Sequence, residues 1–185
     1  ITLKEKPSAV ETHVNTIFPL KKNHLIGYWR MDGDFTDSSG NGNDGTAGGG
    51  ISFDNSAKIG SQTSTLDGVE DYINLDSSAS SIEGLSQGTL SFWAKSSSTA
   101  NQAPINLGIG SGNSDWMLLT LGNLTGAYAD ESINFQLKRG GATQLSMYVR
   151  NGETAYLDGQ WHHIVLRIDG IDNAIFVDED MQFNE

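Results

Sequence analysis

The stretch GTLSFWAK, at residues 88–95, alternates apolar and polar side chains and places Leu90, Phe92 and Ala94 on one face of an extended chain. The stretch WHHIVLRI, at residues 161–168, shows the same alternation in its second half. A period of two is typical of a β-strand with one buried face, because successive side chains of a strand point to opposite sides. Both stretches are therefore predicted to be strands that turn one face toward a core.

Shorter runs of the same kind lie around these two strands and are separated by turns rich in Gly, Asn, Asp and Ser. The further predicted strands are residues 25–31, 51–53, 58–66, 71–75, 103–109, 116–121, 133–137, 144–149 and 174–177. Together they make about eleven short strands, and the chain after residue 24 shows no helical periodicity. This pattern predicts an all-β fold, either a two-sheet antiparallel sandwich or a barrel.

The first 24 residues differ from the rest, because they hold four of the eleven basic residues and two of the three prolines. We expect residues 1–24 to form an N-terminal arm or linker, with a short helix around residues 9–16. The alternative is a poorly ordered terminus. Residues 25–185 are then expected to form one domain, since this length suits a single all-β fold.

The net charge of −12 argues against nucleic acid as a partner, because phosphate binding needs clustered Lys and Arg. The same sign disfavours an anionic membrane surface. The chain has no cysteine, which excludes disulfides and zinc sites built on thiolates. No apolar run approaches the roughly 20 residues that span a bilayer, so membrane insertion is not expected.

Residues 32–50 hold four aspartates, two asparagines and seven glycines, which favour turns over helix. Carboxylate oxygens, amide oxygens and backbone carbonyls are the ligands that calcium prefers. The spacing is not that of an EF-hand, which needs Gly at its sixth loop position and Glu at its twelfth. Two interpretations stay open with equal weight: a calcium site, or a polar turn between two strands.

Four blocks of sequence occur in order along the chain, within the span from residue 28 to 177. They are YWRMDG followed by DSSGNGNDGT at residues 28–33 and 37–46, LDGVEDYI at 66–73, GTLSFWAK at 88–95, and WHHIVL at 161–166. This series resembles the laminin-G-like domains of the concanavalin A-like lectin/glucanase superfamily. The resemblance implies a jelly-roll sandwich of two curved antiparallel sheets.

The resemblance also implies a calcium ion near the first strand and the turn after it. By position, its candidate ligands are Asp32, Asp34, Asp37, Asn41 and Asp44.

Family members continue past the strand at 174–177 with further closing strands, whereas this chain ends at Glu185. We expect either a trimmed chain or a closing strand supplied by another chain, with an open sheet edge suited to strand pairing or self-assembly.

Glucanases of the superfamily carry their catalytic acids at alternate positions of one strand, and the nearest cluster here is Asp178-Glu179-Asp180. Adjacent strand residues face opposite sides, so Glu179 cannot share a cleft with its neighbours, and a solvated turn is expected. His162 and His163 are adjacent too, and we expect one to be buried and the other exposed. We therefore expect no enzymatic activity.

Trp116 and Tyr148 are candidates to stack on sugar rings, although a sandwich also uses aromatic residues in its core.

The predicted function is a non-catalytic binding or adhesion module of an extracellular, cell-surface or virion-surface protein. It is expected to recognise carbohydrate or a surface protein and to be stabilised by calcium. Two alternatives stay open. One is an assembly domain of an adhesin, appendage or virion that docks through its N-terminal arm and open edge; the other is an accessory domain of a polysaccharide-degrading enzyme.

Overall fold

The computed structural model describes residues 24–98, 100, 102–109, 115–122, 131–150 and 156–184. The chain divides into two compact units, Ile1–Leu85 and Ser86–Glu185. The predicted N-terminal arm, with its helix around residues 9–16, lies outside the described residues except for His24. None of the helices described is long and apolar enough to cross a membrane.

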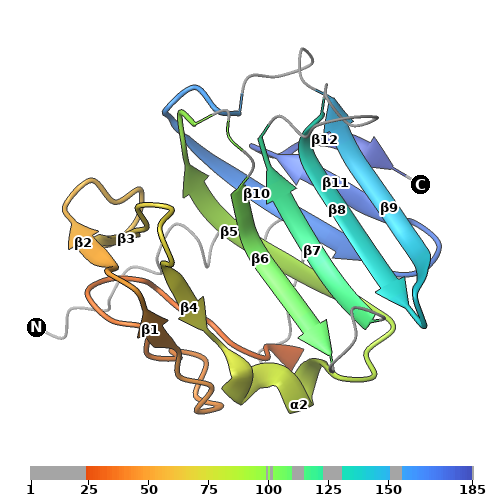
Figure 1. The fold of residues 1–185 in the computed structure, drawn as a ribbon, viewed down its shortest axis with the longest axis horizontal. Coiled ribbons are helices and arrows are strands. Elements are labelled where there is room, and N and C mark those ends of the chain that lie inside the picture. Colours follow the sequence, from red (N-terminus) through yellow and green to blue (C-terminus); the bar gives the residue numbers. More distant parts are fainter. Residues whose placement is uncertain are drawn as a thin grey trace, which may run out of the picture. The chain divides into compact units, whose positions relative to one another are not determined.

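The second unit contains two four-stranded sheets whose neighbouring strands are all antiparallel. One sheet has the order β12-β11-β10-β5 and consists of β5 (Gly88–Lys95), β10 (Trp161–Ile168), β11 (Ala174–Val177) and β12 (Asp180–Asn184). The other is a meander of β6 (Gln102–Ile109), β7 (Asp115–Leu121), β8 (Glu131–Arg139) and β9 (Ala142–Arg150). Figure 1 shows the two sheets packed face to face. This arrangement confirms the predicted all-β, two-sheet antiparallel sandwich.

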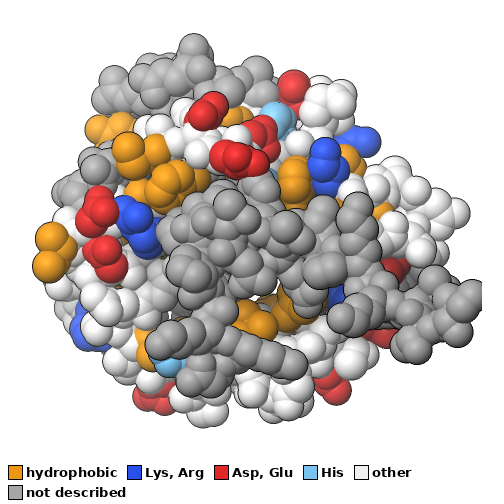
Figure 2. All heavy atoms as spheres, turned by 180° about the vertical axis from the view of Figure 1, so that it is seen from behind, with side chains coloured by type: hydrophobic (Ala, Val, Ile, Leu, Met, Phe, Trp, Pro, Cys, Tyr) orange, Lys and Arg blue, Asp and Glu red, His pale blue; other side chains and the backbone are white. Residues whose placement is uncertain are grey.

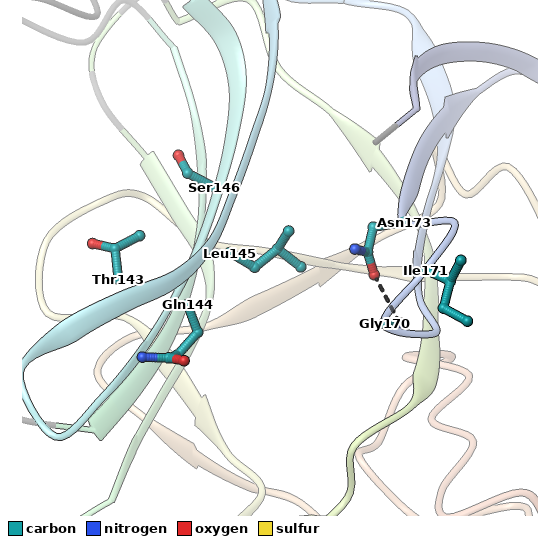
Figure 3. A pocket seen from close by; sticks show the side chains of 7 residues that line it. All are labelled: Thr143, Gln144, Leu145, Ser146, Gly170, Ile171 and Asn173. Carbon is teal, nitrogen blue, oxygen red and sulfur yellow. Dashed lines mark hydrogen bonds between the residues drawn. The ribbon is translucent and has the colours of Figure 1, made fainter.

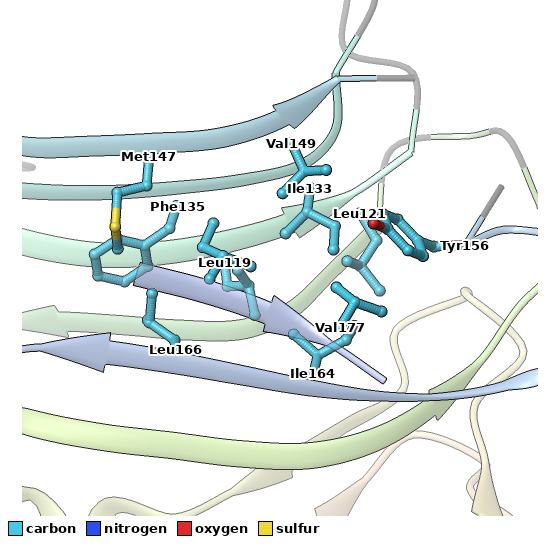
Figure 4. Packing of buried hydrophobic residues seen from close by; sticks show 11 residues of the cluster. Leu119, Leu121, Ile133, Phe135, Met147, Val149, Tyr156, Ile164, Leu166 and Val177 are labelled. Atoms are coloured by element: carbon cyan, nitrogen blue, oxygen red, sulfur yellow. The ribbon is translucent and has the colours of Figure 1, made fainter. Parts of the chain in front are cut away.

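The core of the sandwich lies between the two sheets and is built from the alternating residues of their strands (Figure 4). The meander contributes Phe135 and Met147, and the other sheet contributes Ile164 and Leu166, all of them at most 2% exposed. Leu90, Phe92 and Ala94 pack against this cluster, as the alternation in residues 88–95 predicts. Each fully buried side chain of this size contributes about 1.5–3 kcal/mol to folding.

The described part of the first unit, from residue 24 onward, has four strands of three residues each. β1 (Thr46–Gly48) pairs with β4 (Tyr72–Asn74), and β2 (Ser52–Asp54) pairs with β3 (Thr63–Thr65). A short 3-10 helix η2 (Asp76–Ser78) and one turn of helix, α2 (Ala79–Ile82), follow. The sequence predicts neither the helical turn nor β1, because both lie in stretches whose residues favour turns.

The strand predicted at residues 25–31 is wrong, because the structure has only an isolated bridge between Trp29 and Asp37 there. Side chains take the place of a partner strand. The Tyr28 amide donates to the Asp37 carboxylate, and the Asn43 amide group donates to the Ile26 carbonyl. Asp and Asn offer the backbone such local alternatives to a β-ladder.

β12 is a further correction, since the sequence predicts no strand after residue 177. Asp178 and Glu179 form a two-residue turn, as expected, and both adopt positive φ values of 50° and 77°. Two central residues with positive φ make the tight turns that join antiparallel strands. Gly and Asn usually occupy these positions, so the pair Asp178-Glu179 does not indicate a hairpin in the sequence. As a result β12 covers the edge of β11.

Charged side chains are spread over the surface of the described residues. On the face shown in Figure 2, Lys and Arg lie apart from one another among acidic and neutral side chains. The described part of that face therefore carries no continuous basic strip.

Candidate functional site

The face of the β6–β9 sheet that points away from the core carries both aromatic candidates. Trp116 and Tyr148 each alternate with core residues, since Leu119 and Met147 point inward. Both aromatic side chains are partly exposed. The structure therefore brings Trp116 and Tyr148 to one surface, which we call the outer face.

The strand register arranges the outer face in three transverse rows. The cross-strand pairs are Trp116 with Lys138, Leu118 with Gln136, Gln136 with Ser146, Thr120 with Asn134, and Asn134 with Tyr148. Trp116 and Tyr148 thus occupy diagonal corners. With about 3.4 Å per residue and about 4.8 Å between strands, they lie about 17 Å apart.

The Trp116 corner is fixed by a cation–π contact. The Lys138 ammonium lies 5.0 Å from the centroid of the Trp116 ring. Lys138 is the only charged member of these rows, so its charge is directed onto an aromatic ring of the protein itself. The contact holds the indole in place as part of the surface.

The exposed part of the outer face is mixed in character, and Lys138 is the one charged residue of its three rows. Thr120 and Asn134 are only 5% and 4% exposed, and the Thr120 hydroxyl donates to the Asn134 carbonyl at 3.4 Å. The partly exposed residues are Trp116, Leu118, Gln136, Lys138, Ser146 and Tyr148. Such a surface offers apolar ring faces beside amide and hydroxyl groups, which suits a neutral ligand with both apolar and hydroxylated sides.

Sequence reasoning finds the two aromatic residues of this face but not their neighbours. Gln136, Lys138 and Ser146 carry no signal of their own in the sequence. Their place beside Trp116 and Tyr148 follows from the register of β7, β8 and β9, which residue alternation alone does not give.

Asp37, one of the five calcium candidates, is a hydrogen-bond acceptor at the centre of its loop. Its carboxylate accepts four hydrogen bonds of 2.8–3.0 Å, from the backbone of Tyr28, Ser39 and Asn43 and from the Ser39 hydroxyl. Burial acts to raise the pKa of Asp37, but these bonds outweigh it and lower the pKa to about 2. The carboxylate is therefore kept ionised and oriented by the chain.

The other four candidates also take part in hydrogen bonds with the backbone. Asp32 accepts from the amides of residues 61 and 62, Asp34 from residue 36, and Asp44 from residue 37. The Asn41 side chain donates to the carbonyls of residues 25 and 26. Among the described residues, no three His, Cys, Asp or Glu side chains are grouped so that they could hold a metal ion. Calcium binding at these positions stays a prediction, and calcium would compete with bonds already made.

The histidine pair of the WHH motif has two different environments. His163 is buried, hydrogen-bonded to the Ser91 hydroxyl at 2.8 Å and stacked on Trp93. His162 is not exposed as predicted, because its side chain is 12% exposed and lies edge-on to the Tyr156 ring. Both residues therefore hold the fold together in the described structure.

His162 bridges two carboxylates. Its Nδ1 lies 2.7 Å from the Asp178 carboxylate and its Nε2 lies 3.0 Å from the Asp158 carboxylate. Burial acts to lower the pKa of His162, but the hydrogen bonds and charges of Asp178 and Asp158 raise it above 6.5. The imidazole of His162 thus links the turn before β10 to the β11–β12 turn, and its protonated form is favoured by both carboxylates.

The His162 bridge predicts a modest loss of stability as the pH rises. A pKa that is higher in the folded state gives stabilisation that is complete below the unfolded pKa of about 6.5 and disappears as the pH rises through the folded pKa. Because Asp158 and Asp178 are substantially exposed, we expect about 1 kcal/mol or less. Denaturant unfolding between pH 6 and 9 measures it. The His162→Gln variant should show a smaller pH dependence than the wild type, and equal slopes would contradict the prediction.

The described strands of the second unit form a two-sheet antiparallel sandwich. A profile of the concanavalin A-like lectin/glucanases superfamily matches residues 67–182, more than half of the chain, and the chain belongs to this superfamily. The match confirms the resemblance seen in the sequence blocks, although the first block lies outside it. No curated protein matches the chain.

Two solved structures are similar to the chain. One is domain 4 of AbnA, a GH43 extracellular arabinanase from Geobacillus stearothermophilus, in complex with arabinotriose; it is 20% identical, with a TM-score of 0.60, over 86% of this chain and 74% of that one. The other is an S-layer domain-containing protein from Clostridium thermocellum, 18% identical, with a TM-score of 0.52, over 86% of this chain and 71% of that one. At these identities the similarity concerns the fold.

Proposed function

We propose that the protein is a non-catalytic carbohydrate-binding module whose ligand lies across the outer face. The observation that carries this proposal is the placement of Trp116 and Tyr148 at opposite corners of a surface whose three rows are uncharged apart from Lys138, with Gln136 and Ser146 between them. An aromatic ring can cover the apolar face of a sugar, while amide and hydroxyl groups exchange hydrogen bonds with its hydroxyls. Membership of a lectin-containing superfamily supports this assignment.

The ligand class is a neutral, linear oligosaccharide. Lys138 is the one charged residue of the three described rows and lies over the Trp116 ring, so these rows offer little to an acidic glycan beyond that contact. The two aromatic corners are about 17 Å apart by strand geometry, which favours a chain of several sugar units over a monosaccharide. The arabinotriose complex of the similar arabinanase domain supports a short pentose chain as the first probe.

Binding without cleavage is part of the proposal. The acidic cluster nearest to a glucanase pattern is used structurally, since Asp178 accepts from the backbone amide of His163 at 2.9 Å and contacts His162. The proposal also places the protein outside the cell or on its surface. The similar domains belong to an extracellular enzyme and to an S-layer protein, which supports that location.

Calorimetric titration against a panel of oligosaccharides tests the proposed function. Neutral probes such as arabinotriose, xylotriose and cellotriose are compared with a charged probe, trigalacturonate. We expect at least one neutral chain to bind, and no product to appear on prolonged incubation. Failure of every neutral chain to bind, or release of shorter sugars, would overturn the proposal. Tyr72→Ala is the control variant, because Tyr72 is an exposed aromatic residue of the first unit.

A further inference from the structure

A polar hollow of about 400 Å³ lies at the edge of the meander sheet (Figure 3). One wall is the start of β9, residues 143–146, and the other is the turn between β10 and β11, with Gly170, Ile171 and Asn173. No charged side chain lines it. β9 is the last strand of its sheet, so the hollow borders a free sheet edge among the described strands. A neutral ligand that forms hydrogen bonds fits this lining.

Asn173 supplies a directed hydrogen-bond donor to the hollow. Its side chain is only 8% exposed, and its Oδ1 accepts the backbone amides of Asp169 and Gly170 at 3.1 and 3.2 Å. These two bonds fix the orientation of the amide group. Its Nδ2 donates no hydrogen bond to the described residues, and Figure 3 shows the nitrogen turned toward Leu145 across the hollow. A nearly buried amide whose donor is directed into a hollow is suited to a ligand acceptor.

Gln144 supplies a matching acceptor because of a β-bulge. The register passes from Leu137–Leu145 directly to Lys138–Thr143, so Gln144 is the extra residue of β9. A bulge redirects a side chain out of the regular alternation of the strand. The Gln144 Nε2 donates to the Ala142 carbonyl at 3.3 Å, which leaves its Oε1 as the acceptor. The hollow thus has one amide donor and one amide acceptor, the complement of a sugar hydroxyl pair.

The hollow is continuous with the outer face through Ser146. Ser146 lines the hollow and also stands opposite Gln136 in the middle row of the outer face. The distance from Trp116 on β7 to strand β9 is two strand spacings, or about 10 Å. A chain that starts on the Trp116 ring must cross these two spacings and pass Ser146 before it enters the hollow, so the units beyond the third are the ones expected to reach it.

We infer that the hollow is an extension subsite that takes a neutral sugar unit of a longer chain lying on the outer face. Asn173 donates to one hydroxyl and Gln144 accepts from another. The inference rests on the proposed function, since the chain must first lie on the outer face. It predicts that affinity rises with chain length until the chain reaches the hollow.

The test uses Asn173→Asp in the full chain, because aspartate keeps the acceptor for Asp169 and Gly170 and loses the donor. A series from arabinotriose to arabinohexaose is titrated. We expect Asn173→Asp to bind the hexaose roughly three- to tenfold more weakly than wild type, as for one lost hydrogen bond, with triose affinity unchanged. Asn55→Asp adds the same charge at an exposed site of the first unit and should leave both affinities unchanged. Gln144→Ala should show the same selective loss of hexaose affinity. If Asn173→Asp does not fold, Gln144→Ala is used in its place.

The outcomes separate the subsite from the binding face. An unchanged hexaose affinity in both hollow variants, or an equal loss for triose and hexaose, overturns the subsite. In that case, loss of binding to both sugars in Trp116→Ala would show that the outer face of the wild type is still the binding site. In the wild type, the Asn173 side-chain amide signals should shift with hexaose and stay in place with triose. A shift with both would also contradict an extension subsite.

Discussion

Replacing Trp116 by alanine is expected to weaken binding of a neutral oligosaccharide by about thirtyfold or more. The substitution removes the ring at one corner of the outer face and with it the partner of Lys138. Truncation of a Trp that anchors a ligand at a binding surface commonly costs about 2 kcal/mol or more, which corresponds to that factor. Folding should be little affected, because the ring lies on the opposite side of the sheet from the core residues Leu119 and Phe135.

Two control variants show whether the affinity depends on the aromatic ring at position 116 or on any exposed aromatic residue. Trp116→Phe keeps an aromatic face and should recover part of the affinity. Tyr72→Ala removes an exposed aromatic residue of the first unit and should bind as the wild type does. Calorimetry measures affinity, and a thermal melt of each variant confirms that it is folded. Equal affinity of Trp116→Ala and wild type would remove the outer face as the binding site.

Replacing Asp37 by alanine is expected to destabilise the loop of residues 32–50 by about 2–4 kcal/mol. Four donors from Tyr28, Ser39 and Asn43 lose their acceptor, and each lost hydrogen bond costs about 0.5–1 kcal/mol at such partly buried positions. Asp37→Asn keeps one acceptor oxygen and should lose about half as much. Amide hydrogen exchange at Tyr28, Ser39 and Asn43 measures the effect locally. Unchanged exchange in Asp37→Ala would contradict it.

The same residue gives the loop a defined dependence on acid. Because the pKa of Asp37 is lowered to about 2 from 3.8, the carboxylate stabilises the folded state fully above pH 3.8, and this contribution is lost as the pH falls through 2. The shift corresponds to about 2 kcal/mol. Asp37→Asn should show a flatter exchange profile than wild type between pH 5 and 2. Parallel profiles would show that another carboxylate governs the acid response.

Calcium provides a separate test of the predicted metal site. If Asp32, Asp34, Asp37, Asn41 and Asp44 hold calcium, a hundredfold excess of the ion over its dissociation constant should raise stability by about 2.7 kcal/mol. The measurement is a thermal melt after chelator treatment, with and without calcium, in wild type and Asp37→Asn. A rise in wild type that Asp37→Asn lacks supports the site. No rise in wild type leaves the loop as a hydrogen-bonded turn.

The parts of the fold that the sequence predicts best are those set by alternation alone. The strands at residues 88–95 and 161–168 begin and end in the structure where the pattern places them, with their apolar faces toward the core. The strand predicted at residues 25–31 does not form, because the side chains of Asp37 and Asn43 make the hydrogen bonds that a partner strand would make. β12 is missed because an acidic pair adopts a turn that usually needs Gly or Asn.

The candidate site is predicted only in part, for a physical reason. Trp116 and Tyr148 can be chosen by residue type, but their arrangement depends on which strands pair and in what register. Lys138 reaches Trp116 across two paired strands. The hollow depends on a bulge at Gln144 and on a turn that is distant in sequence, so no local pattern reveals it.

An NMR titration of the isotope-labelled chain with arabinotriose tests the binding face most directly. Backbone and side-chain signals of β7, β8 and β9 should shift, with the largest changes at the outer-face residues Trp116, Gln136, Ser146 and Tyr148. Signals of residues 32–50 should stay in place. Shifts confined to that loop, or no shift with arabinotriose or any other neutral oligosaccharide, would contradict carbohydrate binding on the outer face.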